Sequence, residues 1–291
     1  MPGGRAEHCE AGEGADQSVI YSSPHVHTQF CDGRSTAEEM VRSALAGGCK
    51  SLGFSSHARQ NFDSPSAMTA EGEQAYIAEI HRLQSVYGDR IRIWLGTELD
   101  FYSCADTAPY DYFIGSMHYL PGAHGFTAVD GSAKRLHAFC QAEYGGDGLA
   151  LARDYYMAYA AMMRSRKPLI GGHLDLVRKS NPQLHLFDED SPVYHGYVQR
   201  ALDAALEAGV ILEVNTGGMA RYNAPKPYPD RWILERWHAM GGQVILASDC
   251  HYAPQLLTHY AEAAEMLKEI GYRTVRVLGT GDELIEETEL D

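Results

Sequence analysis

Residues 19–33, VIYSSPHVHTQFCDG, hold a short apolar run that is followed at once by His25 and His27. The run over residues 19–23 predicts a β-strand, because β-branched and aromatic residues are typical of short buried strands. Two imidazoles that stand two residues apart in an extended segment point to the same side of the chain and can bind one metal ion. The segment therefore predicts a strand that ends at a metal site.

The same arrangement recurs along the chain. Six further apolar runs predict strands over residues 51–55, 91–96, 112–115, 168–171, 210–214 and 244–247. Stretches of helical periodicity separate most of these runs, at residues 37–46, 76–86, 149–163, 193–208 and 231–240. Strands that alternate with helices pair in parallel. Seven such repeats predict an α/β fold, a distorted seven-stranded (β/α)7 barrel of the TIM type.

Side chains that bind metals stand at the ends of these predicted strands. They are His25, His27, His57, Glu98, His118, His173, Asp249 and His251. In a parallel barrel, the carboxyl ends of all strands open on one face, so that residues far apart in the sequence meet there. We therefore expect these side chains to converge on one metal-binding face.

The length and composition predict one globular domain. The chain has 291 residues, of which 45% are hydrophobic and 22% charged. This length lies within the range of single α/β barrels, so we expect one domain over residues 19–291. Residues 1–18 are rich in Gly, Glu and Ala and predict a flexible N-terminal tail without a signal peptide. No apolar run approaches the roughly 20 residues of a membrane span, which disfavours a membrane protein.

The cysteines indicate the cellular compartment, and the net charge limits the kinds of partner that we expect. The six cysteines are scattered without a Cys-x-x-Cys pair, which favours a reduced, cytoplasmic protein over a disulfide framework. The 24 Lys and Arg against 39 Asp and Glu give a formal net charge of −15. This charge repels polyanions and disfavours non-specific nucleic-acid binding. A small phosphate could still bind in a local positive site, and the oligomeric state stays open.

Seven motifs occur in an order that resembles the PHP (polymerase and histidinol phosphatase) family, and its histidinol-phosphatase branch in particular. They are HVHTQFCDG, FSSH, GTELD, GSMH, GGHLDLVRK, EVNTGG and ASDCH, and they lie between residues 21 and 252. The resemblance implies the PHP fold and a set of metal ligands. Carried over position by position, these ligands are His25, His27, Asp32, His57, Glu98, His118, His173, Asp249 and His251.

The same resemblance implies two to three divalent transition metal ions, and His-rich ligation with carboxylates suits Zn, Fe or Mn. One ion would take His25, His27, Glu98 and Asp249, a second Glu98, His118 and His173, and a third Asp32, His57 and His251. Three divalent ions carry about +6 and the three carboxylates about −3, which leaves about +3. A phosphate dianion and one hydroxide would neutralise this charge.

The expected reaction is the hydrolysis of a phosphate monoester by in-line attack of a hydroxide that bridges two ions. The residues expected to take part in catalysis are Glu98, His57, Asp249 and His251. The third ion, or a water on it, is the expected proton source for the leaving alkoxide.

Basic residues near two strand ends predict contacts to the substrate. Arg178 and Lys179 follow the fifth predicted strand, and Arg221 follows the sixth, with Lys226 as a further candidate. An Arg fork suits phosphate oxygens, and the resemblance suggests Arg178 and Arg221 as the phosphate contacts, with Lys179 or Lys226 as substitutes. Residues 118–144, which include His124 in a Gly-rich stretch, are long for a connection between a strand and a helix and predict a lid.

The resemblance implies a histidinol-phosphatase, which converts L-histidinol phosphate to L-histidinol and phosphate in histidine biosynthesis. Another enzyme of the same family, acting on a different small phosphate ester, a nucleotide or a phosphodiester, would use the same ligands. A metal-binding module without enzymatic activity is the third hypothesis. It is disfavoured because structural metal sites are closed and dedicated to one ion.

Overall fold

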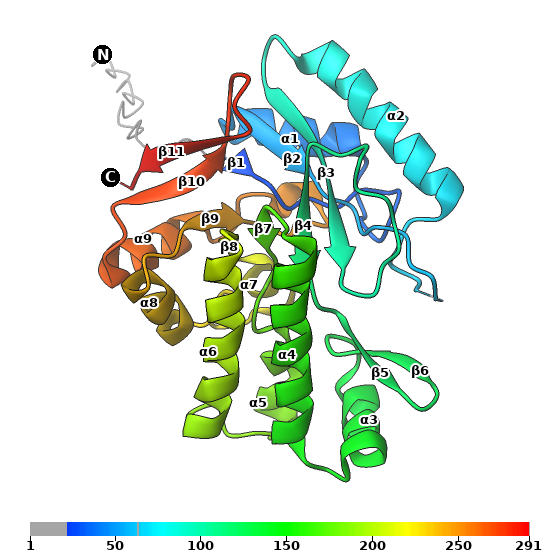
Figure 1. Ribbon diagram of the computed structural model, residues 1–291. Coiled ribbons are helices and arrows are strands. Elements are labelled where there is room, and N and C mark those ends of the chain that lie inside the picture. Colours follow the sequence, from blue (N-terminus) through cyan, green and yellow to red (C-terminus); the bar gives the residue numbers. More distant parts are fainter. Residues whose placement is uncertain (1–21, 63, 291) are drawn as a thin grey trace, which may run out of the picture.

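The computed structural model of the protein describes residues 22–62 and 64–290, and the tail predicted over residues 1–18 lies outside these ranges. Nine strands form the main sheet in the order β1-β2-β3-β4-β7-β8-β9-β10-β11, and helices surround it (Figure 1). Neighbouring strands from β1 to β10 are parallel, and β11 is antiparallel to β10. The predicted α/β fold with a parallel sheet is therefore confirmed.

The elements have the following bounds. The strands of the main sheet are β1 Ser22–Ser23, β2 Ser51–Phe54, β3 Arg92–Asp100, β4 Tyr112–Ser116, β7 Ile170–Gly171, β8 Ile211–Asn215, β9 Val244–Ala247, β10 Thr274–Leu278 and β11 Ile285–Glu289. The helices are α1 Ala37–Ala46, α2 Ala70–Tyr87, α3 Ala133–Tyr144, α4 Gly148–Arg166, α5 Asn181–Leu184, α6 Pro192–Glu207, α7 Gly217–Tyr222, α8 Arg231–Ala239 and α9 Tyr260–Ile270. The described residues also contain two short 3-10 helices, η1 Leu176–Ser180 and η2 Ala253–Gln255.

Each of the seven predicted strands corresponds to one of β1–β4 and β7–β9, although residues 19–21 of the first prediction lie outside the described ranges. The predicted strand count is wrong, because β10 and β11 extend the sheet. In β10, Val275 and Val277 are buried while Thr274 and Arg276 are partly exposed. This alternation is typical of a strand with one solvated face, unlike the continuous apolar runs from which the other strands were predicted.

Helix α1 shows how local sequence sets an element boundary. The Thr36 side chain accepts a hydrogen bond from the backbone of Glu39, and the Glu39 side chain reaches back to the backbone of Thr36. This capping box satisfies two backbone donors at the start of the helix. Ala37, Met40 and Ala44 are buried along one face. The predicted bounds, residues 37–46, are those of the structure.

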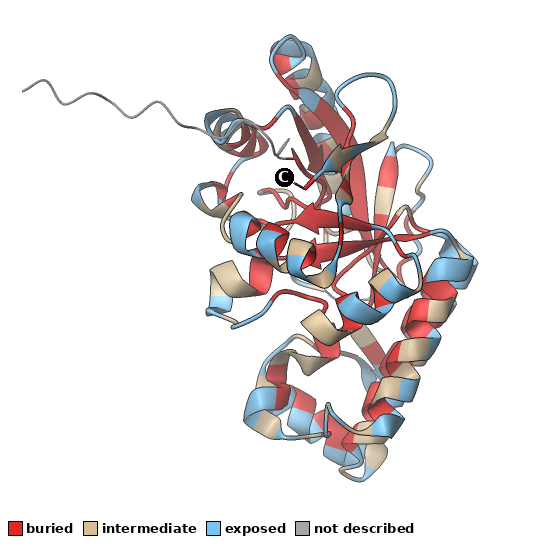
Figure 2. Ribbon diagram, turned by 90° about the vertical axis from the view of Figure 1, so that its left-hand side faces the viewer, coloured by how far each residue is buried: buried red, intermediate tan, exposed pale blue. Residues whose placement is uncertain are grey.

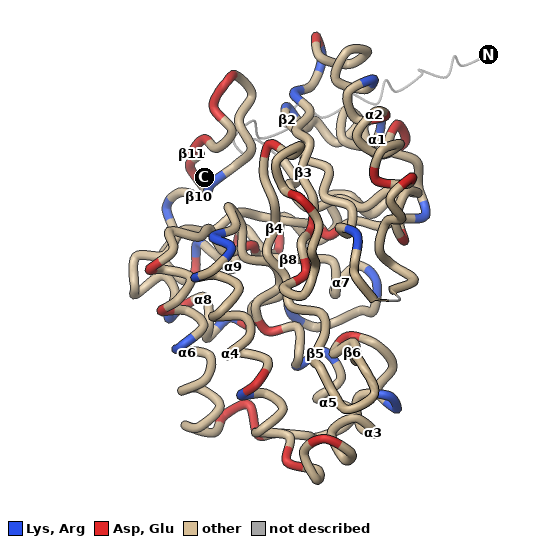
Figure 3. The backbone as a smooth tube through the Cα atoms, turned by 45° about the vertical axis from the view of Figure 1, so that its right-hand side comes forward, with Lys and Arg blue, Asp and Glu red and all other residues tan. Residues whose placement is uncertain are grey.

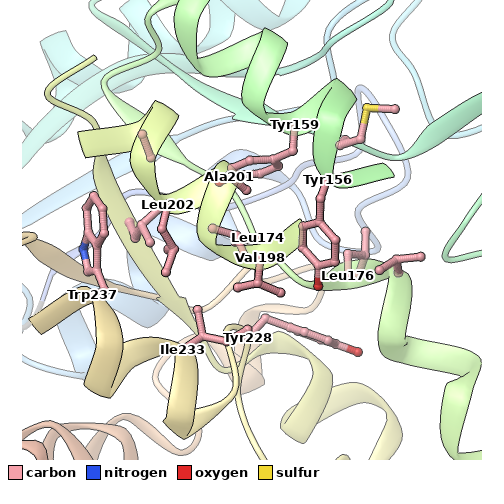
Figure 4. Close-up of a cluster of buried hydrophobic side chains, with 14 of the residues drawn as sticks. Tyr156, Tyr159, Leu174, Leu176, Val198, Ala201, Leu202, Tyr228, Ile233 and Trp237 are labelled. Atoms are coloured by element: carbon pink, nitrogen blue, oxygen red, sulfur yellow. The ribbon is translucent and has the colours of Figure 1, made fainter. Parts of the chain in front are cut away.

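The hydrophobic core lies between the sheet and the helices around it. Strands β1–β4 and β7–β9 are almost entirely buried, whereas the helices expose one face (Figure 2). Helices α4 and α6 pack against each other and bury a group of aromatic side chains (Figure 4). Within this group, the hydroxyls of Tyr156 and Tyr194 are hydrogen-bonded at 2.7 Å, which satisfies two polar groups that burial removes from water.

Residues 118–144, predicted as a lid, form a small hairpin and a helix. Strands β5, Tyr119–Gly122, and β6, Gly125–Ala128, pair antiparallel, and α3 follows them. The ring of Phe126 on β6 stacks on that of Phe62 with centroids 4.3 Å apart. The segment is therefore packed onto the loop after β2.

In the described part of the chain, no helix combines the length and the apolar character needed to cross a membrane.

Candidate metal centre

The carboxyl ends of the parallel strands bring together all nine residues that the sequence singled out as metal ligands. They are His25, His27 and Asp32 after β1, His57 after β2, Glu98 on β3, His118 after β4, His173 after β7, and Asp249 and His251 after β9. The side chain of Asp32 is 36% exposed, and the other eight are at most 17% exposed. The nine residues, called the histidine cluster below, are therefore a mostly buried group.

Glu98 lies at the middle of the histidine cluster. Its two carboxylate oxygens face ring nitrogens of five histidines. Oε2 lies 3.3 Å from His25, 3.4 Å from His27 and 2.9 Å from His57, and Oε1 lies 3.3 Å from His118 and 3.0 Å from His173. Because the two oxygens face different histidines, one carboxylate has the geometry to join two neighbouring cation positions.

The other two carboxylates of the cluster also lie close to histidines. Asp249 Oδ1 lies 3.1 Å from His27 Nε2 and 3.6 Å from His25 Nε2. Asp32 Oδ1 lies 3.2 Å from His251 Nε2. The described residues contain three groups whose ligand atoms lie within 4.8 Å of one another: His27, Asp32, His57 and His251; His25, His27 and Asp249; and His57, Glu98 and His118. These groups differ from the expected division, since His57 contacts Glu98 and His27 lies near Asp32.

Unpaired atoms in the cluster test whether a cation fits. Nε2 of His25, Nε2 of His27 and Oε2 of Glu98 are buried, and none of the neighbouring groups given above is aligned to form a hydrogen bond with them. Buried polar atoms almost always have partners, because an unpaired one loses its hydration without compensation. Imidazole nitrogens and carboxylate oxygens are also the preferred donors for Zn and related ions. The donor set therefore fits divalent transition metals.

The protonation of Glu98 and His57 is coupled. Burial acts to raise the pKa of Glu98, but the charges of His25 and His57 outweigh burial and hold that pKa well below its usual range. Burial acts to lower the pKa of His57, but the Glu98 carboxylate raises it to about 10. In the metal-free chain, Glu98 is therefore ionised and His57 is protonated. A cation that binds His57 must displace this proton, because only the neutral ring is a ligand.

Asp249 and His27 are already in the forms that bind metals. Burial acts to raise the pKa of Asp249, but Arg221 and His25 outweigh it and hold that pKa well below its usual range. Burial, with the neighbouring His251, lowers the pKa of His27 to about 3. An ionised carboxylate and a neutral imidazole are the ligand forms of these side chains.

Backbone geometry directs two of the acidic ligands. Asp32 stands in a tight turn in which the N–H of Gly33 donates to the carbonyl of Thr28 at 3.1 Å. A Cβ atom on Gly33 would lie 2.6 Å from the Thr28 nitrogen, so the close approach requires glycine. Asp249 has φ of +46°, a left-handed conformation that Asp tolerates better than most residues. Left-handed non-glycine residues gather at functional sites.

Glu213 on β8 supports the cluster and was missed from the sequence. Its Oε2 lies 2.7 Å from Nδ1 of His25. Its Oε1 accepts hydrogen bonds from the backbone N–H of His173 at 2.6 Å and from Nδ2 of Asn215 at 2.8 Å. A carboxylate on Nδ1 leaves Nε2 of His25 as the ligand atom. The available signal was a charged residue in the middle of an otherwise apolar strand, and Figure 3 shows such acidic positions on β3 and β8.

Two further residues hold ligands in place. Asp100, at the end of β3, accepts a hydrogen bond from the backbone N–H of His118 at 2.8 Å, and its Oδ2 lies 3.5 Å from Nδ1 of the same histidine. Ser116 Oγ donates to Oε1 of Glu98 at 2.6 Å. Both residues lie inside the quoted motifs GTELD and GSMH, although the sequence did not predict their roles.

A cleft of about 100 Å³ opens above the histidine cluster, and two predicted substrate-binding residues line it. Lys179 Nζ donates to the carbonyl of Asp130 at 2.7 Å and lies 4.4 Å from the ring centre of Tyr222. Arg221 donates through Nη2 to Oδ2 of Asp249 at 2.7 Å and lies with Nη1 2.9 Å from Nδ1 of His251. Lys179 therefore faces the cleft, while Arg221 holds two cluster residues.

Arg178, predicted to contact the phosphate, does not line the cleft. Its Nε donates to Oδ2 of Asp175 at 2.5 Å, and Nη2 donates to the carbonyl of Pro227 at 2.6 Å. Asp175 is fully buried, and a buried carboxylate requires a partner. The 3-10 turn η1 places Arg178 three residues later against this carboxylate. Lys226 also lies outside the cleft lining, where it pairs with Asp230 at 2.9 Å.

The structure places His124 away from the histidine cluster. His124 lies between β5 and β6 and lines a separate hollow against α3, together with Phe126 and Arg135. The hairpin contributes Tyr119 to the cleft, and the Tyr119 hydroxyl is hydrogen-bonded to Ser64 at 2.8 Å.

Comparison with known proteins identifies relatives across most of the chain. Residues 23–217 match the family model described as the PHP domain. The chain is 32% identical over 262 residues to the probable histidinol-phosphatase of Deinococcus radiodurans, covering 86% of this chain and 94% of the relative. It is 30% identical over 256 residues to the histidinol-phosphatase of Bacillus subtilis, covering 79% of this chain and 92% of the relative.

A solved structure shares the fold. It is the histidinol phosphate phosphatase of Lactococcus lactis, crystallised as a complex with zinc, L-histidinol and phosphate. The two structures align with a TM-score of 0.67 at 21% sequence identity, and the alignment covers 90% of this chain and 98% of the other. The mixed α/β arrangement is therefore that of a known phosphatase structure.

Proposed function

This chain belongs to the PHP family, and from that membership we propose that it is a metal-dependent histidinol-phosphatase, which hydrolyses L-histidinol phosphate to L-histidinol and phosphate. The observation that carries the proposal is the convergence of five histidines on the two oxygens of Glu98. Curated relatives with this activity in their names match the chain over most of their length.

We propose that the histidine cluster holds two to three divalent ions, chosen from Zn, Fe and Mn. The Lactococcus lactis protein was crystallised with zinc, and the unpaired buried atoms of His25, His27 and Glu98 support a cation within the histidine cluster of this chain. Divalent ions polarise phosphoryl oxygens and lower the pKa of water, which supplies a nucleophile near neutral pH. Glu98, with one oxygen toward each side of the cluster, is the residue proposed to join two ion positions.

The residues around the cleft have distinct proposed roles. Lys179 is the proposed phosphate contact, because its ammonium lines the cleft and has N–H donors left after its single bond to the Asp130 carbonyl. Arg221 is proposed to orient Asp249 and His251, which it contacts directly, and to add positive charge beside the phosphate. His57, Asp249 and His251 with Glu98 form the proposed catalytic group.

We propose that the parallel strands close into the distorted (β/α)7 barrel expected from the sequence, with β10 and β11 as additions. Support comes from the bridge between Val26 and Cys250, which joins the extensions of β1 and β9. Its hydrogen bonds run from the N–H of His27 to the carbonyl of Cys250 at 2.9 Å and from the N–H of Cys250 to the carbonyl of His25 at 3.2 Å. Closure at this end would encircle the histidine cluster.

Residues 19–291 are proposed to form one domain that works in the cytoplasm. The support is the reduced state expected for the scattered cysteines and the role of the relatives, whose names describe a small-molecule phosphatase. The proposed partner is a small phosphate ester.

The test compares kcat/KM for histidinol phosphate with that for an aliphatic amino-alcohol phosphate, a nucleoside monophosphate and a phosphodiester. We expect histidinol phosphate to be preferred. If one of the competitors is hydrolysed as well as histidinol phosphate, the substrate assignment fails while the phosphoesterase assignment stands. If the metal-loaded protein hydrolyses none of them, the phosphatase assignment fails.

A further inference from the structure

One carboxylate that lines the cleft has no part in the histidine cluster. Among the described lining residues, the acidic side chains are Asp32, Glu98, Asp130 and Asp249. Asp32, Glu98 and Asp249 each contact histidines of the cluster. Asp130 contacts none of them within 4 Å, and no hydrogen bond joins its carboxylate to any described residue. It forms one long ion pair, with Lys179 at 3.9 Å, and both of its oxygens can still accept a hydrogen bond from a ligand.

Backbone contacts hold Asp130 at the wall of the cleft. The N–H of the neighbouring Val129 donates to the carbonyl of His118 at 2.8 Å, and Val129 is fully buried. On the other side, the carbonyl of Asp130 accepts the hydrogen bond from Lys179. The side chain itself is 34% exposed. The carboxylate thus stands next to a cluster ligand and open to solvent in the cleft.

The neighbouring Lys179 forms no hydrogen bond with the carboxylate of Asp130. Its Nζ lies 2.7 Å from the backbone carbonyl of Asp130 but 3.9 Å from Oδ2, which is beyond hydrogen-bond distance. The cleft therefore presents one cation and one anion side by side, each with bonding capacity left. Such a pair matches a ligand that carries a phosphate and an ammonium group close together.

Histidinol phosphate is a ligand of this kind. Its ammonium is attached two carbon atoms from the ester oxygen, so that a phosphate at the cluster keeps the ammonium within the same cleft. Resting on the proposed function, we infer that Asp130 binds the substrate ammonium and selects phosphate esters with an amine at this position. A charge-assisted hydrogen bond from the ammonium to the carboxylate satisfies both groups, whereas an ester without an amine leaves Asp130 unpaired.

The experiment pairs a change in the protein with a change in the ligand. The wild type and Asp130→Asn are compared on L-histidinol phosphate and on the same ester without its amino group. We expect the wild type to favour the amine-bearing ester by about tenfold or more in kcat/KM, the size of a charge-assisted hydrogen bond. In Asp130→Asn this preference should fall below about threefold. Calorimetric binding of L-histidinol and of its deamino analogue should show the same loss.

Asp89→Asn is the matched control, because Asp89 is exposed after α2 and is absent from the cleft lining. It removes the same charge from the surface and should keep the wild-type preference. Thermal melting of Asp130→Asn checks its fold, and Asp130→Ala is the second variant. An unchanged preference in both Asp130 variants, or an equal loss on both esters, overturns the inference. A wild type that hydrolyses nucleotides better than histidinol phosphate contradicts the proposed function instead.

Discussion

Glu213 Oε2 lies 2.7 Å from Nδ1 of His25, and both side chains are fully buried. A carboxylate that accepts from Nδ1 fixes the tautomer of the ring and directs Nε2 outward as the ligand atom. The Nε2 atom of His25 is one of the buried atoms without a partner in the described structure, and it lies 3.3 Å from Oε2 of Glu98. The carboxylate on β8 thus orients a candidate ligand that comes from β1.

Glu213→Gln should lower metal affinity by about 10- to 100-fold, the usual effect of removing a partner of a ligating histidine. The amide keeps the size of the side chain but supplies only one acceptor, whereas Glu213 accepts on one oxygen from the backbone of His173 and faces His25 with the other. Titration with a competing chelator measures the affinity. Glu286→Gln, on the partly exposed strand β11, is the control. Equal affinities of Glu213→Gln and wild type would contradict a role of Glu213 in positioning His25.

Glu98→Gln should be among the most damaging single changes. It removes the charge that faces five histidines while nearly preserving the side-chain volume, so we expect loss of at least one ion per chain. The fall in kcat/KM should exceed about 100-fold, which is the largest usual effect of removing a residue that only hydrogen-bonds to a metal ligand. Elemental analysis of gently purified protein, together with phosphate release, checks both effects. Full metal content in an active Glu98→Gln protein would exclude the proposed bridging role.

Removal of the metals should abolish phosphatase activity and expose a pH dependence of stability. Since the pKa of His57 is raised to about 10 from an unfolded value of about 6.5, its protonated form stabilises the metal-free fold. This stabilisation is fully present below about pH 6.5 and is lost as the pH rises through about 10.

The difference in melting temperature between chelated wild type and chelated His57→Gln measures this contribution. The difference should shrink between about pH 7 and pH 10, at about 2–4 °C for each kcal/mol. Subtracting the variant removes the titration of lysines and tyrosines that both proteins share. A difference that stays constant over this range would show that His57 is not protonated in the metal-free fold.

Arg178→Ala should destabilise the fold without a specific effect on the phosphate. The Arg178 side chain is 12% exposed and its partner Asp175 is fully buried, so the substitution leaves an uncompensated buried carboxylate at a cost of about 3–5 kcal/mol. Denaturant unfolding measures the loss. Adding Asp175→Asn to the same chain should restore part of the stability, because no buried charge then remains unpaired. A double variant as unstable as the sum of the single variants would contradict this pairing.

Lys179→Ala should lower kcat/KM by about 10- to 100-fold, the loss of a charge-assisted contact, while metal content stays at the wild-type level. Arg221→Ala should differ, because Arg221 contacts both Asp249 and His251, and its loss should also reduce metal content. Metal analysis and steady-state kinetics on both variants separate the roles. Unchanged kinetics of Lys179→Ala would mean that the phosphate is held by other groups.

The sequence predicted the α/β class and the order of the seven βα repeats because each depends on local patterns. Buried parallel strands are continuous apolar runs, and capped amphipathic helices such as α1 carry their boundaries in neighbouring residues. Strand β10 was missed because one of its faces is partly exposed, and β11 because its sequence is mostly polar and none of its residues is buried. The hairpin of β5 and β6 was missed because its pairing depends on packing against the loop that holds Phe62.

In the candidate site too, the sequence predicted one group of residues, the ligands, and not another, the residues that hold the ligands in place. Eight of the nine candidate ligands stand at or shortly after strand ends, so that the parallel order of the strands was sufficient to predict that they meet. The ninth, Asp32, lies in a turn further along the chain and was expected from the resemblance to the PHP family. The partners of these ligands were not predictable in this way. Asp100, Ser116 and Glu213 are hydrogen-bonded to cluster residues that other strands carry, and such pairings depend on how the strands lie against one another, which no single segment encodes.

The sequence by itself therefore determined which side chains gather at one face. The alternation of strands and helices makes the strands parallel, and the carboxyl ends of parallel strands lie on the same face. Only the tertiary structure decided what each basic residue does. Arg178 and Lys179 are neighbours in the sequence, yet the turn of η1 directs Arg178 to the buried Asp175 and Lys179 to the cleft. A buried carboxylate attracts the cation that can reach it, and which cation can reach it depends on the folded path of the backbone.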